Sequence, residues 1–218
     1  MSRGLGDVYK RQPIKAYDNV GDYFSNGVTA TNSLSIMTGK EKMQTYFSYA
    51  NTTAKGIVDV NKLQKHNITF RETASLFNDR LTLDANVNLM TQKIKNRPTS
   101  GGYYMNPLVG LYTFPRGEDL GVYRNNNGFE KYDESRAMPL QNWYTEINGF
   151  SQNPYWLTNR VTGTDKRFRT LASLSANLKI TDWFSVQARG NVDYINDNYD
   201  QKMYAGTAVS YTHLRAHE

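Results

Sequence analysis

The hydrophobic pattern is clearest between Leu81 and Gln92, where an apolar residue recurs at every second position. These positions are Leu81, Leu83, Ala85, Val87 and Leu89. A regular alternation of this length predicts a β-strand with one apolar face. The preceding stretch repeats the pattern with Ile68, Phe70, Ala74 and Leu76, and Glu72 is the exception on that face. Only residues 78–80 separate the two stretches, so together they predict a β-hairpin.

A second hairpin of the same kind is predicted nearer the C-terminus, with its turn at Thr181 and Asp182. Its apolar positions are Phe168, Ala172, Leu174, Ala176, Leu178 and Ile180, followed by Phe184, Val186, Ala188, Val192 and Tyr194. A third, less regular hairpin runs from Val28 to Thr52 and turns at residues 38–41. Each predicted strand has about ten residues or more, enough to cross a bilayer when tilted. Strands of soluble proteins more often have about five or six.

The connections between the predicted strands differ sharply in length. Three are tight turns, residues 54–62 form a longer link, and residues 97–163 form a very long one rich in Gly, Pro, Asn, Tyr and Trp. Short turns at one end and long loops at the other are typical of outer-membrane β-barrels, whose long loops face out of the cell. The pattern therefore predicts an all-β fold, an antiparallel meander of about six long strands with one long extracellular loop.

The composition suits strands that expose one apolar and one polar face. The chain has 16 Tyr and 13% aromatic residues, yet its mean hydropathy is only −0.68. No run approaches 18 consecutive apolar residues, so no membrane-spanning helix is predicted. The net charge of +6 comes from scattered basic residues, which argues against a nucleic-acid partner. The absence of cysteine excludes a disulfide framework and cysteine-based zinc sites.

The two ends of the chain are set apart from the fold. Residues 1–12 and 209–218 resemble translated sequencing-adapter read-through, and the alternative is that they are a genuine arm and tail. We expect both ends to make few contacts with the sheet. The segment with the predicted barrel strands is then residues 13–208.

Several short motifs lie in and around the long link. They include Asn96-Arg97-Pro98, Asn106-Pro107-Leu108-Val109-Gly110, Gln141-Asn142-Trp143, Gln152-Asn153-Pro154-Tyr155-Trp156 and Thr181-Asp182-Trp183. In this order and spacing they resemble the SusC/RagA family of TonB-linked outer-membrane proteins. The similarity extends from about residue 17 to about residue 206.

The resemblance implies an architecture and a set of partners. The segment would be an open part of a 22-stranded transmembrane β-barrel that is plugged by an N-terminal domain. TonB would act through that plug region, which this segment lacks, and a SusD-like lipoprotein would cover the barrel at the cell surface. The parent protein would import an oligosaccharide or peptide ligand through the outer membrane, with outer-membrane lipid around the barrel. We expect the segment alone to be inactive.

No catalytic, cofactor or metal site is predicted. His66 is the only histidine outside the C-terminal tail, where His213 and His217 lie. Neighbouring carboxylates occur at Glu118–Asp119 and Asp133–Glu134. A glycosidase needs two carboxyls about 5 to 9.5 Å apart across a cleft, so solvated loop charge is the favoured interpretation.

Aromatic side chains of the long link are the candidate contacts to substrate or to a lid partner, because a ring pairs a large apolar face with a polar edge. The five candidates are Tyr103, Tyr104, Trp143, Tyr155 and Trp156. Packing of the loop against itself, or an interfacial girdle, is the structural alternative. The basic residues Arg167, Arg169, Lys179 and Arg189 fall on polar strand faces. We expect them to pair with the plug rather than to recognise substrate.

The apolar faces give the sharpest structural expectation. In a barrel they lie on the convex outer surface, and the residues expected there are Leu81, Leu83, Val87, Leu174, Leu178, Val186 and Val192. The alternative fold is a soluble secreted β-sandwich, such as a carbohydrate-binding module, which also alternates polar and apolar residues. In a sandwich the same side chains would fill a closed core.

Overall fold

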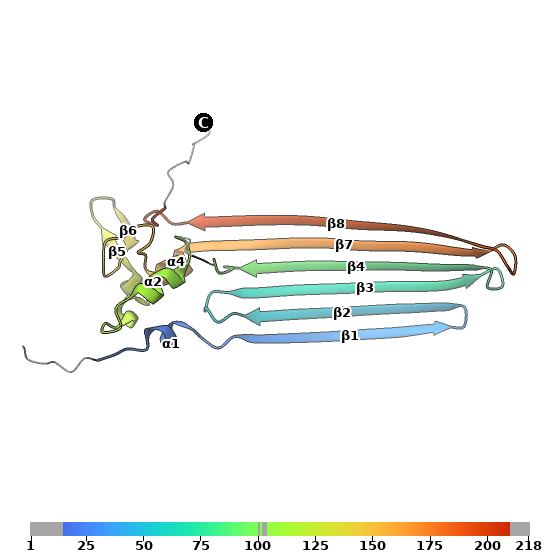
Figure 1. The fold of residues 1–218 in the computed structure, drawn as a ribbon, viewed down its shortest axis with the longest axis horizontal. Helices are drawn as coiled ribbons and strands as arrows, with labels where there is room; N and C mark the ends of the chain where they lie inside the picture. Colours follow the sequence, from blue (N-terminus) through green and yellow to red (C-terminus); the bar gives the residue numbers. More distant parts are fainter. Residues whose placement is uncertain (1–14, 100, 102–103, 210–218) are drawn as a thin grey trace, which may run out of the picture.

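The main element of the structure is a six-stranded antiparallel sheet in the order β1-β2-β3-β4-β7-β8 (Figure 1). The computed structural model describes residues 15–99, 101 and 104–209. The strands are β1 (Val28–Lys40), β2 (Met43–Lys55), β3 (Lys62–Leu76), β4 (Leu81–Lys95), β7 (Val161–Lys179) and β8 (Ser185–Met203). Their order in the sheet follows their order in the chain, and this confirms the all-β antiparallel meander.

The strands are longer than the apolar alternation indicates. β7 and β8 each have 19 residues, or about 60 Å at a rise of about 3.3 Å per residue. The last apolar position of β8 predicted from the sequence is Tyr194, and pairing with β7 continues to Met203. Beyond Tyr194 the even-numbered residues of β8 are polar, whereas Ile195, Tyr199 and Met203 lie on the opposite face, so backbone pairing extends the strand past the end of the predicted apolar alternation.

The three tight turns lie together at the end of the sheet furthest from the short helices (Figure 1). They span residues 41–42, 77–80 and 180–184. In chain order, each turn lies further along the strand direction, away from the short helices, than the turn before it. β2 begins at Met43, which pairs with Ala74, whereas β3 continues past that point to Leu76. The backbone N–H of Lys179 donates to the carbonyl of Arg80 at 2.7 Å and links the second and third turns.

The register separates the side chains of the sheet into two faces. One row across all six strands contains Ile36, Phe47, Phe70, Val87, Ala172 and Val192. We call the side that carries this row the apolar face; it holds the even-numbered residues of β1, β3, β7 and β8 and the odd-numbered residues of β2 and β4. The opposite side is the polar face. Successive side chains of a β-strand point to opposite faces, so each residue of the six strands belongs to one face or the other.

The seven side chains expected on the outer surface all lie on the apolar face, and none of them is buried. Val192 is 61% exposed and Leu174 57% exposed. No other element of the described residues covers this face, and none of the buried hydrophobic residues belongs to a strand of the six-stranded sheet. The closed core expected of a β-sandwich is therefore not formed by these strands. Both edge strands, β1 and β8, pair on one side only within the described chain.

The hydrophobic core lies in a separate unit that we call the cap, residues 104–160. It contains α2 (Pro107–Thr113), η1 (Leu120–Tyr123), α3 (Asn126–Phe129), β5 (Glu130–Asp133), β6 (Met138–Gln141) and α4 (Pro154–Arg160). The helix α1 (Asn19–Tyr23) and residues 204–208 pack onto it. The long link is thus folded rather than irregular. β7 begins at Val161, so its first residues fall inside the range predicted for the link, residues 97–163. None of the helices described is long and apolar enough to cross a membrane.

Candidate functional site

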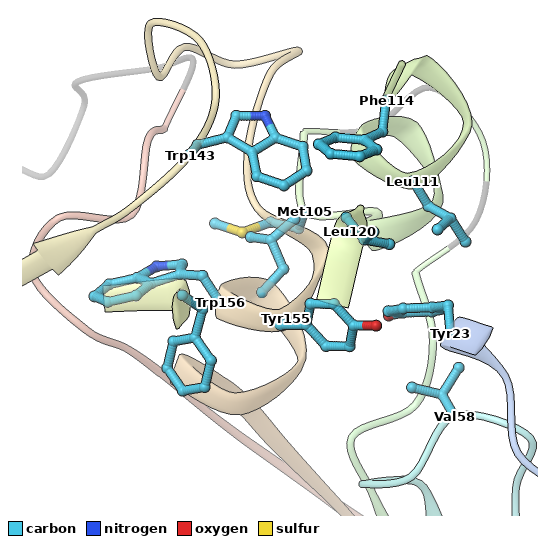
Figure 2. Packing of buried hydrophobic residues seen from close by; sticks show 11 residues of the cluster. Tyr23, Val58, Met105, Leu111, Phe114, Leu120, Trp143, Tyr155 and Trp156 are labelled. Atoms are coloured by element: carbon cyan, nitrogen blue, oxygen red, sulfur yellow. The ribbon is translucent and has the colours of Figure 1, made fainter. Parts of the chain in front are cut away.

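The cap is held together by aromatic rings in mutual contact. The ring of Trp143 lies 5.2 Å from that of Phe114 and 4.9 Å from that of Tyr144. Trp156 has no exposed surface, and its indole N–H donates to the hydroxyl of Thr207 at 2.9 Å. Figure 2 shows Phe114, Trp143 and Trp156 together with Leu111 and Leu120, contributed by several elements. Aromatic residues of this kind supply a large area of burial with defined geometry.

Two Asn-Pro pairs start the two seven-residue helices of the cap. The side chain of Asn106 accepts from the backbone N–H of Leu108, and that of Asn153 accepts from the backbone N–H of Tyr155. Proline follows at the first helical position in both cases. An Asn cap followed by proline is a favourable helix start because it satisfies a free N–H and fixes φ. These motifs therefore have a direct structural role.

A buried polar network joins the parts of the cap. Gln152 donates from Nε2 to the carbonyls of Tyr104 and Ala208 at 3.0 and 3.1 Å, and its Oε1 accepts from Gln141 at 3.2 Å. The side chain of Asn153, fully buried, donates to the carbonyl of Asn142 at 2.9 Å. Buried amides whose partners are all present specify one arrangement of the chain. The network fixes residue 208, close to the C-terminal end of the described chain, onto the cap.

Three of the five aromatic residues predicted as contacts to substrate or lid partner are buried in the cap. Trp143, Tyr155 and Trp156 are core residues, so their ring faces are occupied by other side chains. Packing of the loop against itself, the structural alternative, is what the structure shows for these three. Tyr104 is partly buried against the same core, and Tyr103 lies outside the described residues.

Two tyrosine hydroxyls in the cap region have raised pKa values. Burial is the main cause at Tyr23 and at Tyr155, whose rings are 5.3 Å apart. A raised pKa keeps both phenols neutral at physiological pH, because desolvation disfavours the phenolate. The pair therefore packs as two neutral rings.

A bidentate ion pair that sequence reasoning did not find closes one side of the cap. Arg160 Nη2 lies 2.6 Å from Glu130 Oε2, and Arg160 Nε lies 2.9 Å from the same atom. The guanidinium also lies 4.8 Å from the ring centroid of Tyr204. The two charged residues are 30 positions apart, and no local pattern marks them as partners. Planar bidentate pairs of this type fix orientation as well as adding energy.

Ion pairs also cross the polar face of the sheet. Arg71 pairs with Asp84 on β4, and Arg167 and Arg169 pair with Asp197 and Asp193 on β8, all at 2.7 Å. The neighbouring strand therefore supplies carboxylates to Arg167 and Arg169. Their expected pairing with a plug stays a prediction. Lys179 and Arg189 have no ion pair among the described residues.

The remaining candidates from the sequence have local roles. Tyr49 Oη lies 2.8 Å from His66 Nδ1, and their rings stack at 6.1 Å. Asp119 caps η1 by accepting from the N–H of Gly121, and Asp133 accepts from the hydroxyl of Ser135, which lowers the pKa of that carboxyl. Among the described residues, no cluster of three or more His, Asp or Glu side chains is placed to hold a metal ion.

A cavity of about 640 Å³ lies where the cap meets the polar face of the sheet. Its lining includes Asn61, Arg97, Met105, Leu157, Asp165 and Tyr199. Arg97 Nε lies 3.4 Å from Asp165 Oδ2 at its wall, so the lining carries balanced charge. The buried aromatics are not accessible to a small ligand. In the described chain, such a ligand would contact accessible side chains in this cavity, whose lining is partly polar and partly apolar.

The chain was also compared with known proteins. No protein-family model matches it, and no curated protein sequence matches it.

Proposed function

We propose that the six-stranded sheet is part of the wall of a transmembrane β-barrel, with its apolar face towards lipid and its polar face towards the lumen. The observation that carries this proposal is the uncovered apolar face. It extends about 25 Å across the strands and about as far along them, or roughly 600 Å² in projection. The largest apolar patch on a typical soluble monomer has an accessible area of about 300–600 Å². The accessible area of the apolar face here is larger than its projected area, so this face exceeds that range.

The extent of the apolar face along the strands suits a bilayer. On β8 the apolar positions run from Phe184, in the turn before it, to Tyr194, a span of about 33 Å at a rise of about 3.3 Å per residue. A strand tilted by about 40° converts that span into a height of about 25 Å, the apolar band of an outer-membrane barrel.

The one-way stagger of the turns supports such a tilt. The turn at residues 77–80 reaches beyond the turn at 41–42, and the turn at 180–184 reaches further still (Figure 1). Closing a sheet into a barrel requires a progressive shift of register from strand to strand. A flat sandwich sheet has no such requirement.

The polar face has the character of a lumen wall. Between Lys62 and Phe70 on β3, residues of the apolar face are exposed and those of the polar face are half-buried in strict alternation. Side chains crowd on the inner side of a curved sheet and splay on its outer side. The alternation is therefore the pattern that curvature towards the polar face would produce.

Within this class, we infer a nutrient importer of the SusC/RagA type. The support is the set of motifs in the long link, which the structure places at helix starts and in the core of the cap, together with tight turns at one end and a folded cap at the other. On this proposal TonB and a SusD-like lipoprotein are partners of the complete protein, and its ligand is an oligosaccharide or peptide. The segment itself has no enzymatic role.

Paired single-cysteine variants test the barrel proposal, because the chain contains no cysteine. Val192→Cys places the thiol on the apolar face and Asn191→Cys on the polar face, one residue apart. With a polarity-sensitive fluorophore on the thiol, and the full chain reconstituted into phosphatidylcholine vesicles, we expect blue-shifted emission at residue 192 only. Equal, water-like emission at both positions would contradict the proposal.

A further inference from the structure

Five lysine side chains lie on the apolar face of the sheet, beyond its last apolar row and near the ends of the strands closest to the cap (Figure 1). They are Lys55 on β2, Lys62 on β3, Lys93 and Lys95 on β4, and Lys166 on β7. The register places them in two adjacent rows, with Lys93 and Lys166 in the row nearer the apolar side chains. We call these five residues the lysine group.

The lysine group is unfavourable for the sheet itself. Three cross-strand pairs bring two lysines directly opposite each other: Lys55 with Lys62, Lys62 with Lys95, and Lys93 with Lys166. Like charges in directly opposed positions destabilise a sheet. Within the described residues, Lys55 is the only member with an ion pair, to Asp59 at 3.2 Å. The other four ammonium groups are not balanced in this way.

The polar face of the same strands is arranged differently. Arg167 on β7 is matched by Asp197 on β8, with 2.7 Å between Nη2 and Oδ2. Lys166, its neighbour in sequence, lies on the other face opposite Asn198. The chain therefore supplies a carboxylate to the basic residue on the polar face and an amide to the one on the apolar face.

One carboxylate lies near the lysine group. Asp200 on β8 is opposite Thr164 and makes no ion pair with any described residue. A single carboxylate cannot balance four ammonium groups, so positive charge remains for an anion from outside the described chain.

A groove of about 400 Å³ lies at the row of Lys93 and Lys166. Both lysines line it, together with the side chains of Gln64, His66, Phe168 and Asn198. Lys93 is partly buried, whereas Lys166 is exposed. The groove therefore combines two ammonium groups with neutral polar side chains and one aromatic ring.

The groove is continuous with the apolar face. On β7 the residues of this face run from Ala172 through Thr170 and Phe168 to Lys166. On β8 the last apolar residue, Tyr194, and Asn198, opposite Lys166, are four positions apart, or about 13 Å along the strand. A lysine lays its flexible stem along an apolar surface and keeps its ammonium group in a polar layer. Both lysines therefore lie within a short distance of the edge of the apolar face.

Resting on the barrel assignment above, we propose that the lysine group binds the phosphate of a lipid whose acyl chains lie on the apolar face. Lys93 and Lys166 contact the phosphate in the groove, and the row behind them adds positive charge. A phosphate monoester carries a charge of about −1.5 to −2 near neutral pH, which matches two lysines. A zwitterionic headgroup carries its own cation, so phosphatidic acid is favoured over phosphatidylcholine.

Lipid titration of the full chain in nonionic detergent micelles tests this site. Isothermal titration calorimetry compares dioctanoyl phosphatidic acid, dioctanoyl phosphatidylcholine and inorganic phosphate. We expect the phosphatidic acid to bind about tenfold more tightly than either of the others. The double variant Lys93→Gln, Lys166→Gln should weaken that binding about thirtyfold, the contribution of two lysines near an anionic surface.

Two further double variants complete the design. Lys65→Gln, Lys179→Gln removes the same charge from the polar face of β3 and β7 and should change the affinity by less than about twofold. Lys93→Arg, Lys166→Arg keeps both positive charges and should retain binding within about threefold. Retained binding in the arginine variant separates loss of charge from loss of folding.

The outcomes distinguish this inference from the proposed function. Equal losses in the two glutamine variants would show attraction to the whole chain and overturn the site. Inorganic phosphate binding as tightly as phosphatidic acid would overturn the assignment to a lipid, and equal affinity for phosphatidylcholine would overturn recognition of the phosphate monoester. Blue-shifted emission from a fluorophore at residue 192 alongside any of these results would leave the barrel proposal standing. Water-like emission there would overturn the barrel, and the lipid site with it.

Discussion

The sheet and the cap bury apolar side chains in different ways. All eleven hydrophobic residues of the buried core lie outside the six long strands, in the cap and the short segments packed against it. The sheet is a single layer held by backbone pairing, with its apolar face open. The cap has a closed core, whereas no other element of the described residues covers the apolar face of the sheet.

The tyrosines illustrate the contrast. In the cap region, Tyr23 and Tyr155 are buried with their rings in contact. On the sheet, Tyr49 and Tyr194 are exposed near one end of the apolar face. The same residue type is therefore part of a buried core in one region and exposed on a strand face in the other.

The largest expected effect is on solubility. Residues 13–208 expressed alone should aggregate or require detergent, because the uncovered apolar face and the open edges of β1 and β8 are unfavourable in water. Detergent covers the apolar face and should keep the chain dispersed. Size-exclusion chromatography with and without detergent measures the difference.

A soluble monomer with a cooperative thermal transition in the absence of detergent would contradict this expectation. It would show that the strands find a closed core of their own. The comparison between sheet and cap would then fail, and the transporter proposal with it.

The second prediction compares two tryptophans. Trp156→Ala removes a side chain with no exposed surface and should destabilise the cap by about 3–5 kcal/mol, the range for deletion of a buried aromatic. In detergent, near-ultraviolet circular dichroism should show loss of the cap signal, while the far-ultraviolet strand signal persists. Trp183→Ala, at the exposed turn, is the control and should leave the cap signal unchanged. Equal losses in the two variants would show that sheet and cap are one cooperative unit.

The sheet could be predicted from the sequence because period two is a local property. The six strands, their pairing into hairpins and the face on which each side chain lies all follow from this alternation. The outer ends of β7 and β8 could not, since the apolar alternation of the apolar face stops at Tyr194, and Ile195, Tyr199 and Met203 lie on the opposite face.

The cap could not be predicted because its contacts join distant residues. The side chain of Asn19 donates to the carbonyl of Glu118 at 2.9 Å and accepts from the N–H of Leu120, about a hundred positions away. The Asn-Pro pairs of the cap can be recognised in the sequence. Trp143 and Trp156 give the same sequence signal whether their rings contact a ligand or other side chains of the cap. Ligand contact and core packing are therefore both compatible with the sequence.

The smallest of these effects concerns the two asparagine caps Asn153 and Asn125. Asn153 accepts from the N–H of Tyr155 at 2.8 Å and donates to the carbonyls of Asn142 and Tyr123 at 2.9 and 3.3 Å, with no exposed surface. Asn153→Ala should cost about 2–4 kcal/mol, since a lost helix cap costs about 1 kcal/mol and orphaned buried groups add about 1–3 kcal/mol.

Asn125 provides the matched control, because it caps α3 without a side-chain hydrogen bond and is exposed. Asn125→Ala should change cap stability by no more than about 0.5 kcal/mol. Asn153→Asp keeps the acceptor for Tyr155 but places a buried carboxylate oxygen against the carbonyls of Asn142 and Tyr123, so it should cost at least as much as Asn153→Ala. Urea unfolding of the cap in detergent, followed by tryptophan fluorescence, ranks the three variants. If Asn125→Ala proved as costly as Asn153→Ala, helix capping in general, rather than the buried amide network, would be what holds the cap together.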